Sequence, residues 1–290
     1  MRLDRRTFIL TLGAALAAGR RALGDTIPRL GAQLYTVRTL LEKDFEATLA
    51  AIAALGFTEV EFAGYYNRTP EQVRDTLKRH RLTAPSGHID YGSLTGDKWL
   101  RAIESARTIG HTYLVNAWVD EPIRKQPDAW KRIAETYNKA GEASRQAGVQ
   151  FAYHNHHFEF APGQDTGGKL PYDILLDSCD PALVKMELDL FWISATGRDP
   201  LDYFRRYPGR FPLVHVKGLK KMIPDGASAP IERIIAEMTD VGHNDMIDWK
   251  RIFAQSRQAG VQHYFVEHDQ PPVPLDSLKA SYAYLSKLQF

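Results

Sequence analysis

The sequence predicts an α/β fold, a single-domain (β/α)8 or TIM barrel that occupies residues 25–290. Three observations predict it. The chain has 290 residues, 44% of them hydrophobic and 25% charged, which suits one α/β barrel. A helix-like stretch that ends in glycine and runs into a short β-rich segment recurs along the chain, for example in 144–156 and 256–268. Eight strand candidates alternate with eight helical patterns, the order of a parallel barrel.

The strand candidates are short apolar runs bounded by turn residues. They lie at residues 30–37, 59–63, 83–89, 112–118, 150–155, 184–191, 213–217 and 263–267. The helical patterns lie at 44–55, 70–81, 97–109, 128–147, 170–179, 200–207, 248–259 and 275–288. Proline at the first helical position marks two of these starts, Pro70 and Pro200. A doubly wound sheet is the alternative, but the chain contains neither of the usual glycine-rich phosphate-binding motifs.

The segment 218–247 follows the seventh strand candidate and is long for a connection within a barrel. It contains a short helical pattern at 231–238. Long loops at the carboxyl ends of barrel strands are where binding sites and lids lie. We therefore expect this segment to lie close to the functional site.

Residues 1–24 are predicted to be an export signal rather than part of the fold. The basic start is followed by an apolar run from Phe8 to Ala18, which is too short to span a bilayer and to serve as a stable membrane anchor. Arg5 and Arg6, followed by Thr7, resemble the twin-arginine signal, and a plain secretory signal is the alternative. We expect a periplasmic or otherwise exported protein.

Composition excludes several classes of partner and site. The net charge is only +2, and the sequence has no basic patch interleaved with aromatic residues, so we expect no nucleic-acid partner. The single cysteine, Cys179, excludes an intramolecular disulfide and a cysteine-rich metal site. The oligomeric state is left open, and a homo-oligomer is compatible with the sequence.

Polar residues collect where the predicted strands end, which is the face that carries the active site of such barrels. These residues are Glu61, His88, Asn116, the segment YHNHHFEF (153–160), Glu187, Asp189, His215, Lys217, Glu267, His268 and Asp269. A single acid or histidine at a strand end is ordinarily a solvated rim group. Here four consecutive strands, the fifth to the eighth, each end in a carboxylate or an imidazole. That mixture of ligands suits a divalent metal such as Mn, Mg, Co or Zn.

The strand-end pattern resembles the xylose-isomerase-like superfamily of metal-dependent barrels, in particular exported proteins of the sugar (phosphate) isomerase/epimerase family. The resembling segments are GAQLYTVR (31–38), YHNHHFEF (153–160), ELDLFWISATGRDP (187–200), HVKGLK (215–220), DVGHNDMIDW (240–249) and FVEHDQP (265–271). The resemblance implies a metal site made of Glu159, Asp189, His215 and Glu267. His154 or His156 could replace Glu159. The chain departs from the family pattern at Gly218, where an acid often follows the lysine, and at His243 or Asn244.

The resemblance implies an isomerase or epimerase that removes a proton next to the carbonyl of a sugar or keto-sugar and passes through an enediolate. Its expected catalytic residues are Glu159, Glu267, Lys217 and His156. Its expected substrate contacts are His154, Glu61, His88, Glu187, Trp118 and Trp192. The alternative is a lyase or dehydratase that eliminates from a 3-keto-glycoside or an inosose-like substrate. A second alternative is a non-catalytic sugar-binding barrel. In each case the expected partner is a small carbohydrate, and export favours one without phosphate.

Overall fold

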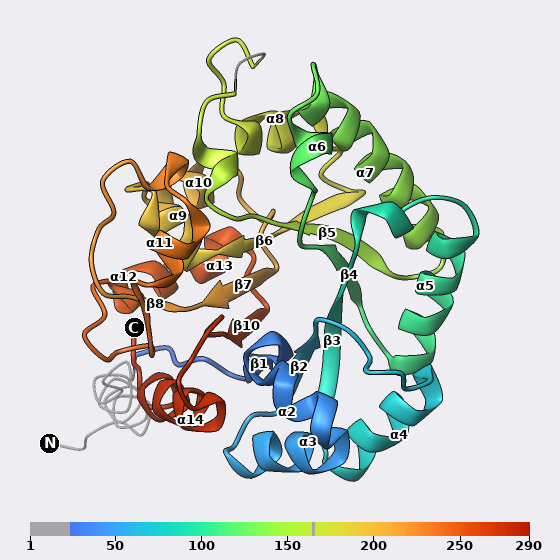
Figure 1. Cartoon of the computed structure of the whole chain (residues 1–290), viewed down its shortest axis with the longest axis vertical. Coiled ribbons are helices and arrows are strands. Elements are labelled where there is room, and N and C mark those ends of the chain that lie inside the picture. The colour runs from blue at the N-terminus through green and yellow to red at the C-terminus, as the bar shows by residue number, and fades with distance from the viewer. Residues whose placement is uncertain (1–23, 164–165) are drawn as a thin grey trace, which may run out of the picture.

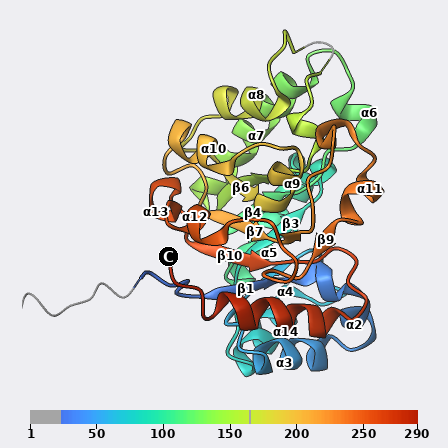
Figure 2. The same cartoon turned by 90° about the vertical axis from the view of Figure 1, so that its left-hand side faces the viewer.

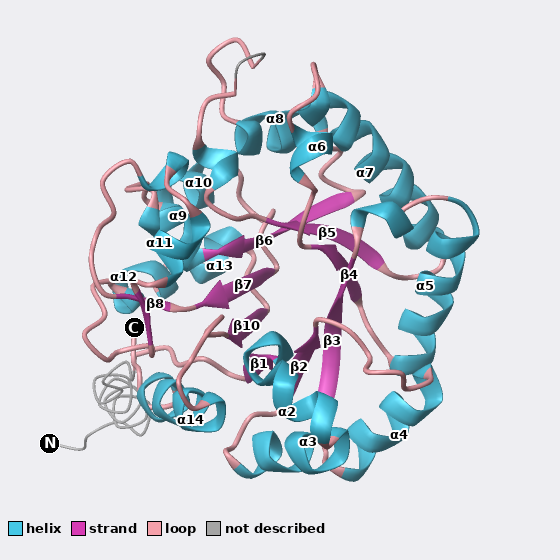
Figure 3. Ribbon diagram, viewed as in Figure 1, coloured by secondary structure: helices cyan, strands magenta, loops and turns pink. Residues whose placement is uncertain are grey.

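The computed structural model describes residues 24–163 and 166–290, so residues 1–23 of the predicted export signal lie outside it. Eight parallel strands close into a barrel in the order β1-β10-β7-β6-β5-β4-β3-β2, and helices surround them (Figures 1 and 3). The strands are β1 (Leu30–Gln33), β2 (Glu59–Phe62), β3 (Thr83–Ile89), β4 (Tyr113–Asn116), β5 (Gln150–His154), β6 (Val184–Asp189), β7 (Leu213–Val216) and β10 (His263–Val266). The predicted (β/α)8 barrel is confirmed.

The helices that cover the barrel follow the predicted order. They are α2 (Arg38–Lys43), α3 (Phe45–Ala54), α4 (Pro70–Arg79), α5 (Gly96–Ile109), α6 (Glu121–Arg124), α7 (Ala129–Gln146), α8 (Pro171–Ser178), α9 (Leu190–Ala195), α10 (Pro200–Arg206), α11 (Ile231–Ile235), α12 (Trp249–Phe253), α13 (Ser256–Ala259) and α14 (Pro274–Leu285). The predicted helix 248–259 is two helices, α12 and α13. Short helix α6 was not predicted.

Two predicted strands are too long, because the chain turns into a helix as soon as the strand leaves the barrel. After β1 the chain forms a 3-10 helix, η1 (Leu34–Val37), and the Gln33 side chain accepts a hydrogen bond from the Tyr35 amide at its start. After β6 it forms α9, which Asp189 caps by accepting a hydrogen bond from the Trp192 amide. Both turns begin at a residue on the site-bearing edge of the barrel.

Local sequence explains several other helix ends. Thr69 and Gln72 form a capping box at the start of α4, with Pro70 at its first position. Gly110 ends α5 in the left-handed conformation, with φ 100°. These signals place the strand starts, and alternation along each strand then decides which side chains point inward.

The barrel interior below the site is filled by a small apolar cluster distinct from the main core between strands and helices. It consists of Tyr113, Val115, Ala152, Leu213 and Phe265. Gly31 makes room for it, since a Cβ there would lie 2.5 Å from the Phe265 ring. Two residues further along four of these strands lie Gln33, His154, His215 and Glu267. Because inward-facing residues alternate along each strand, these four polar side chains lie one layer above the apolar cluster.

The long segment after β7 forms a two-stranded antiparallel arm. β8 (Gly218–Leu219) pairs with β9 (Met238–Thr239), and α11 lies between them, where a short helical pattern was predicted. Figure 2 shows α11 and α6 on one side of the molecule and the carboxyl terminus on the other. Among the described helices, none is long and apolar enough to cross a membrane.

Candidate metal centre and active site

Strand register brings the predicted site residues together on the inner face. His154 of β5 lies opposite Glu187 of β6, and Asp189 of β6 lies opposite His215 of β7. All four side chains are buried. Glu187 and Asp189, two residues apart, face the same side of their strand and provide carboxylates at two heights of the site.

Asp189, His215 and Glu267 form the first of two groups that could hold a metal ion. Their ligand atoms all lie within 4.8 Å of one another. His215 Nδ1 lies 2.8 Å from Glu267 Oε2 and 3.8 Å from Asp189 Oδ2. Both His215 Nδ1 and Asp189 Oδ2 are buried and lack a hydrogen bond of acceptable geometry. Buried polar atoms ordinarily have such partners. A divalent metal bound by this group would be a partner for both atoms, and the donor set suits one.

Lys217 adds a positive charge to this group. Its ammonium is buried and lies 3.1 Å from Asp189 Oδ2, 2.8 Å from Glu267 Oε2 and 2.9 Å from Asp269 Oδ1. Burial alone would lower the pKa of Lys217, but the carboxylates of Asp189, Asp269 and Glu267 raise it well above its ordinary value. Lys217 therefore remains a cation beside Asp189 and Glu267, at the carboxyl ends of the barrel strands.

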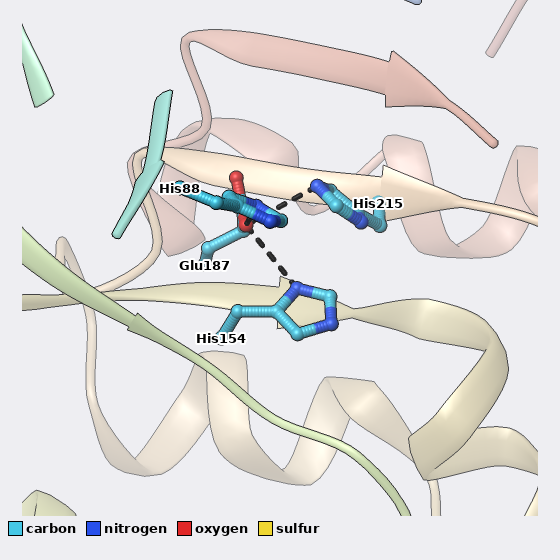
Figure 4. A group of neighbouring side chains, drawn as sticks. All are labelled: His88, His154, Glu187 and His215. Atoms are coloured by element: carbon cyan, nitrogen blue, oxygen red, sulfur yellow. Dashed lines mark hydrogen bonds and ion pairs between the residues drawn. The ribbon is translucent and has the colours of Figure 1, made fainter. Parts of the chain in front are cut away.

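Glu187 is the centre of the second group, which Figure 4 shows with His88, His154 and His215. Its Oε2 atom lies 3.2 Å from His88 Nε2, 3.2 Å from His154 Nδ1 and 3.1 Å from His215 Nε2. The other oxygen, Oε1, is buried without a hydrogen-bond partner. One carboxylate thus touches three imidazoles.

Glu61 contacts two histidines of this second group, His88 and His215. It accepts hydrogen bonds from Gln33 Nε2 at 2.6 Å and from Ser86 Oγ, and it lies 2.6 Å from His215 Nε2. Burial would raise the pKa of Glu61, but His88 and His215 hold it well below its ordinary range. Burial would likewise lower the pKa of His88, but Glu61 and Glu187 raise it to about 9. Glu61 is therefore an anionic partner of the His88 and His215 rings.

Glu159, the predicted strand 5 ligand, does not join the other three. It lies in the 3-10 helix η3 (Phe158–Phe160), where it accepts hydrogen bonds from the Tyr153 hydroxyl and, at 2.9 Å, from the His156 amide. Tyr153 alternates with the inward residue His154 and packs against Tyr137 of α7, on the outer face of the barrel. Neither candidate metal group contains Glu159. The expectation that it ligates the metal with Asp189 does not match this placement.

The predicted site residues Trp118, His156 and Trp192 form an aromatic cluster at the carboxyl ends of the strands. His156 lies between Trp118 and Trp192, with ring centroids 4.9 Å and 5.2 Å away, and its Nδ1 atom is buried without a partner. Trp118 is 40% exposed, which suits a substrate contact. Trp192 is fully buried under the Lys217 ammonium, so it supports the site rather than lining its surface.

Two site residues were not assigned a role from the sequence. Gln33 is buried at the end of β1 and orients Glu61. Asp269 is the third carboxylate on Lys217. Asp269 was signalled by its position at a predicted strand end, whereas Gln33 lay inside the predicted strand 30–37 and within the segment GAQLYTVR. Only the early end of β1 at Gln33 reveals its place in the site.

Comparison with known proteins decides the family. The model of the xylose isomerase-like TIM barrel family matches residues 49–287. The chain belongs to that family. A curated relative is an inosose dehydratase of Lacticaseibacillus casei, 23% identical over 273 residues, which cover 86% of this chain and 87% of the relative. The likeness thus extends over most of the barrel, and the chain is an enzyme of the xylose isomerase-like superfamily.

Several solved structures have a fold similar to that of this chain. A sugar phosphate isomerase/epimerase from Parabacteroides distasonis has a TM-score of 0.74 at 23% identity and covers 93% of this chain and 96% of its own. A probable 3-DHS dehydratase from Bacillus anthracis has a TM-score of 0.66 at 16% identity, with 89% and 99% coverage. The IolI protein, solved with a bound zinc atom, has a TM-score of 0.65 at 14% identity, with 88% and 95% coverage. At these identities the likeness shows the fold.

Proposed function

We propose that this chain is a metal-dependent lyase that dehydrates, or eliminates an alcohol from, a cyclic keto-polyol or keto-sugar. The observation that carries the proposal is the convergence of Asp189, His215 and Glu267 beside the buried ammonium of Lys217. The relatives named inosose dehydratase support elimination over isomerisation as the outcome of the reaction. The proposal therefore prefers what the sequence alone ranked second.

The residues present can perform the proton transfers of such an elimination. When bound, a divalent metal at Asp189, His215 and Glu267 supplies charge stabilisation to a substrate oxygen. Lys217, whose ammonium faces Asp189, Glu267 and Asp269, holds these carboxylates in place beside the substrate oxygen.

His156 takes the proton from the carbon next to the carbonyl. Burial lowers the pKa of His156 well below its ordinary value, so its ring is neutral at rest, and its Nδ1 atom, which has no hydrogen-bond partner, is the acceptor in this proposal. The carbon–hydrogen bond breaks, a carbon–carbon double bond forms, and the β carbon–oxygen bond breaks. The departing oxygen takes up the proton that His156 removed and leaves as water or an alcohol, so the protons balance and the step needs no oxidant.

The substrate that fits this proposal is a small carbohydrate without phosphate. The network around Lys217 pairs its positive charge with three carboxylates of the protein, which leaves little attraction for a phosphate. The predicted twin-arginine signal supports an exported or periplasmic location, where unphosphorylated sugars and glycosides are the expected carbohydrates. A homo-oligomer remains a prediction.

A sugar isomerase or epimerase is the second candidate, since it would use the same proton removal and the Parabacteroides structure of that name superimposes on this barrel. It differs in returning the proton to carbon instead of expelling oxygen. A non-catalytic sugar-binding barrel is disfavoured by the retention of Asp189, His215 and Glu267 in one buried group.

The test uses the mature protein stripped with a chelator and reloaded with Mn, Co, Mg or Zn. Each form is incubated with an inosose, a 3-keto-glycoside, a free ketose and a phosphorylated ketose. We expect an unsaturated ketone to form from one of the first two substrates only after a metal is restored. Activity confined to the phosphorylated ketose, or equal activity after stripping, would contradict the proposal.

A further inference from the structure

We infer that His154 is the strand 5 metal ligand of this chain, in place of a carboxylate, and that Glu187 positions the two ligand histidines. The inference rests on the proposed metal-dependent function and names a site with four ligand atoms. These are His154 Nε2, Asp189 Oδ2, His215 Nδ1 and Glu267 Oε2.

The two nitrogens of His215 have different surroundings. Nε2 makes a hydrogen bond to Glu61 Oε2 at 2.6 Å, which places the ring proton on that nitrogen. In the neutral ring, which is the form that binds a metal, Nδ1 then carries the lone pair. It lies close to Glu267 and Asp189, yet it forms no hydrogen bond with either. A ring nitrogen that lies near two carboxylate oxygens without pointing at them has the geometry of a ligand that shares an ion with them.

His154 repeats this arrangement. Its Nδ1 makes a hydrogen bond to Glu187 Oε2 at 3.2 Å, so the lone pair belongs to Nε2. Nε2 lies 3.8 Å from Asp189 Oδ2, too far for a hydrogen bond. Two ligands of one ion, each bound at about 2.1 Å, lie about 3–3.5 Å apart. His154 and His215 therefore approach Asp189 Oδ2, which itself lacks a hydrogen bond, from two sides at the same 3.8 Å.

The alternative is an ion among His88, His154, Glu187 and His215, whose ligand atoms all lie within 4.8 Å of one another. In that group the atoms point at one another. His88 Nε2 and His154 Nδ1 both make hydrogen bonds to Glu187 Oε2, and His215 Nε2 makes one to Glu61. Aligned pairs of imidazole and carboxylate are the arrangement that orients a metal-binding histidine from behind. Glu187 is thus a positioning residue shared by two ligands.

The other strand 5 candidates have different tasks. Glu159 is held by the Tyr153 hydroxyl and the His156 amide, and it fixes the turn after β5 from the outer face. His156 packs among Trp118, Phe158 and Trp192 at the carboxyl ends of the strands. Of the three, only His154 has a recorded contact with the group of Asp189, His215 and Glu267, through its Nε2 atom 3.8 Å from Asp189 Oδ2.

The experiment measures metal affinity by calorimetric titration of the stripped mature protein with Co²⁺ and follows the visible absorption of the bound ion. Four variants are compared with the unmodified protein: His154→Ala, Glu187→Gln, His88→Gln and Glu159→Gln. The matched control is His263→Gln, which removes a buried histidine paired with a carboxylate, Glu59, at 2.8 Å. That pair lies at the opposite end of β10 and β2, far along the strands from the proposed ligands. Far-ultraviolet circular dichroism checks that each variant is folded.

We expect His154→Ala to lower the Co²⁺ affinity at least 100-fold and to change the absorption spectrum. We expect Glu187→Gln to lower the affinity 10- to 100-fold with the spectrum retained, as for the loss of a carboxylate behind a ligand. His88→Gln, Glu159→Gln and His263→Gln should stay within tenfold of the unmodified protein.

Loss of Co²⁺ in Glu159→Gln with retention in His154→Ala would overturn the inference. A loss in His88→Gln as large as in His154→Ala would overturn it in favour of the second group. A His154-dependent Co²⁺ site in a protein that eliminates from none of the keto-sugars would instead contradict the proposed function and leave this inference standing. An unmodified protein that binds no Co²⁺ would overturn both.

Discussion

Lys217 and Asp269 form a buried ion pair, with Lys217 Nζ 2.9 Å from Asp269 Oδ1. Asp269 thus provides a carboxylate to Lys217 in a chain that has glycine at 218, the position at which the resembling family often has an acid. A Cβ at Gly218 would lie 2.7 Å from the Thr239 carbonyl oxygen and 2.9 Å from that of Asp240. The arm approaches β7 too closely for a side chain there. The chain therefore supplies the carboxylate for Lys217 from the end of β10.

Replacing Lys217 with methionine should destabilise the metal-free protein by about 3–5 kcal/mol, because three buried carboxylates lose their cation. A divalent metal should recover part of that loss, since it supplies positive charge to Asp189 and Glu267. Urea unfolding with and without Mn²⁺ measures both effects. Lys185→Met, which removes a half-exposed lysine of β6, is the control. Equal stability of the Lys217 variant and the control would contradict this account.

Introducing the family acid through Gly218→Asp should destabilise the arm rather than strengthen the Lys217 pair. The new Cβ meets backbone atoms of β9, which cannot move aside as a flexible side chain could. We expect a loss of about 1–3 kcal/mol on the scale of overpacking, together with faster proteolysis within 218–247. Melting temperature and limited proteolysis measure these effects. A variant as stable and as resistant to proteolysis as the original would show that the backbone near Thr239 leaves room for a side chain at position 218.

Asp189→Asn should abolish tight metal binding and lower kcat at least 1000-fold while the fold is retained. Asp189 also caps α9, and asparagine is an equally good cap, so the change isolates the lost ligand charge. Asp199→Asn is the matched control, because Asp199 caps α10 in the same way on the surface. Metal analysis after dialysis separates the two variants. Full metal content in the Asp189 variant would remove this residue from the site.

Glu159 should make the protein less stable at neutral pH than at acid pH. Burial raises its pKa to about 7 from its ordinary value of 4.5. The folded state therefore binds the proton more tightly than the unfolded state. As the pH rises from about 4.5 to about 7, this group alone costs up to about 3 kcal/mol of stability, and above pH 7 its contribution is constant.

Glu159→Gln, which cannot ionise, should lack that pH dependence. Urea unfolding of both proteins at pH 5 and pH 8 gives the difference directly. We expect the variant to gain stability relative to the original at pH 8. A difference between the two proteins that is the same at both pH values would show that Glu159 does not titrate in this range.

The sequence was sufficient for the fold because each barrel strand is a short apolar run that follows a helix-stop signal. Gly110 before β4 and Gly260 before β10 both end a helix in the left-handed conformation, and the next strand begins a few residues later. His215 follows from the end of β7 and Glu267 from the end of β10, and the family resemblance selected both as metal ligands. Which side chains share one face of a strand follows from the sequence of that strand alone, because side chains alternate with a period of two.

The strand 5 side of the site could not be predicted in the same way. The chain leaves β5 at His154 and forms a bend and a 3-10 helix before Glu159, so alternation no longer applies. The partner that holds Glu159 is Tyr153, whose outward direction depends on packing against α7. Asp269 was equally hidden, because its role depends on the arm that brings backbone against Gly218. Both features arise from tertiary contacts rather than from local pattern.

The most direct test of the account is the mass of the product that the metal-loaded protein forms from an inosose. We predict a product lighter than the substrate by one water, formed by the unmodified protein and not by Asp189→Asn or by the stripped protein. A product of unchanged mass would establish an isomerase or epimerase instead. The lighter product from stripped protein would contradict a metal centre at Asp189, His215 and Glu267.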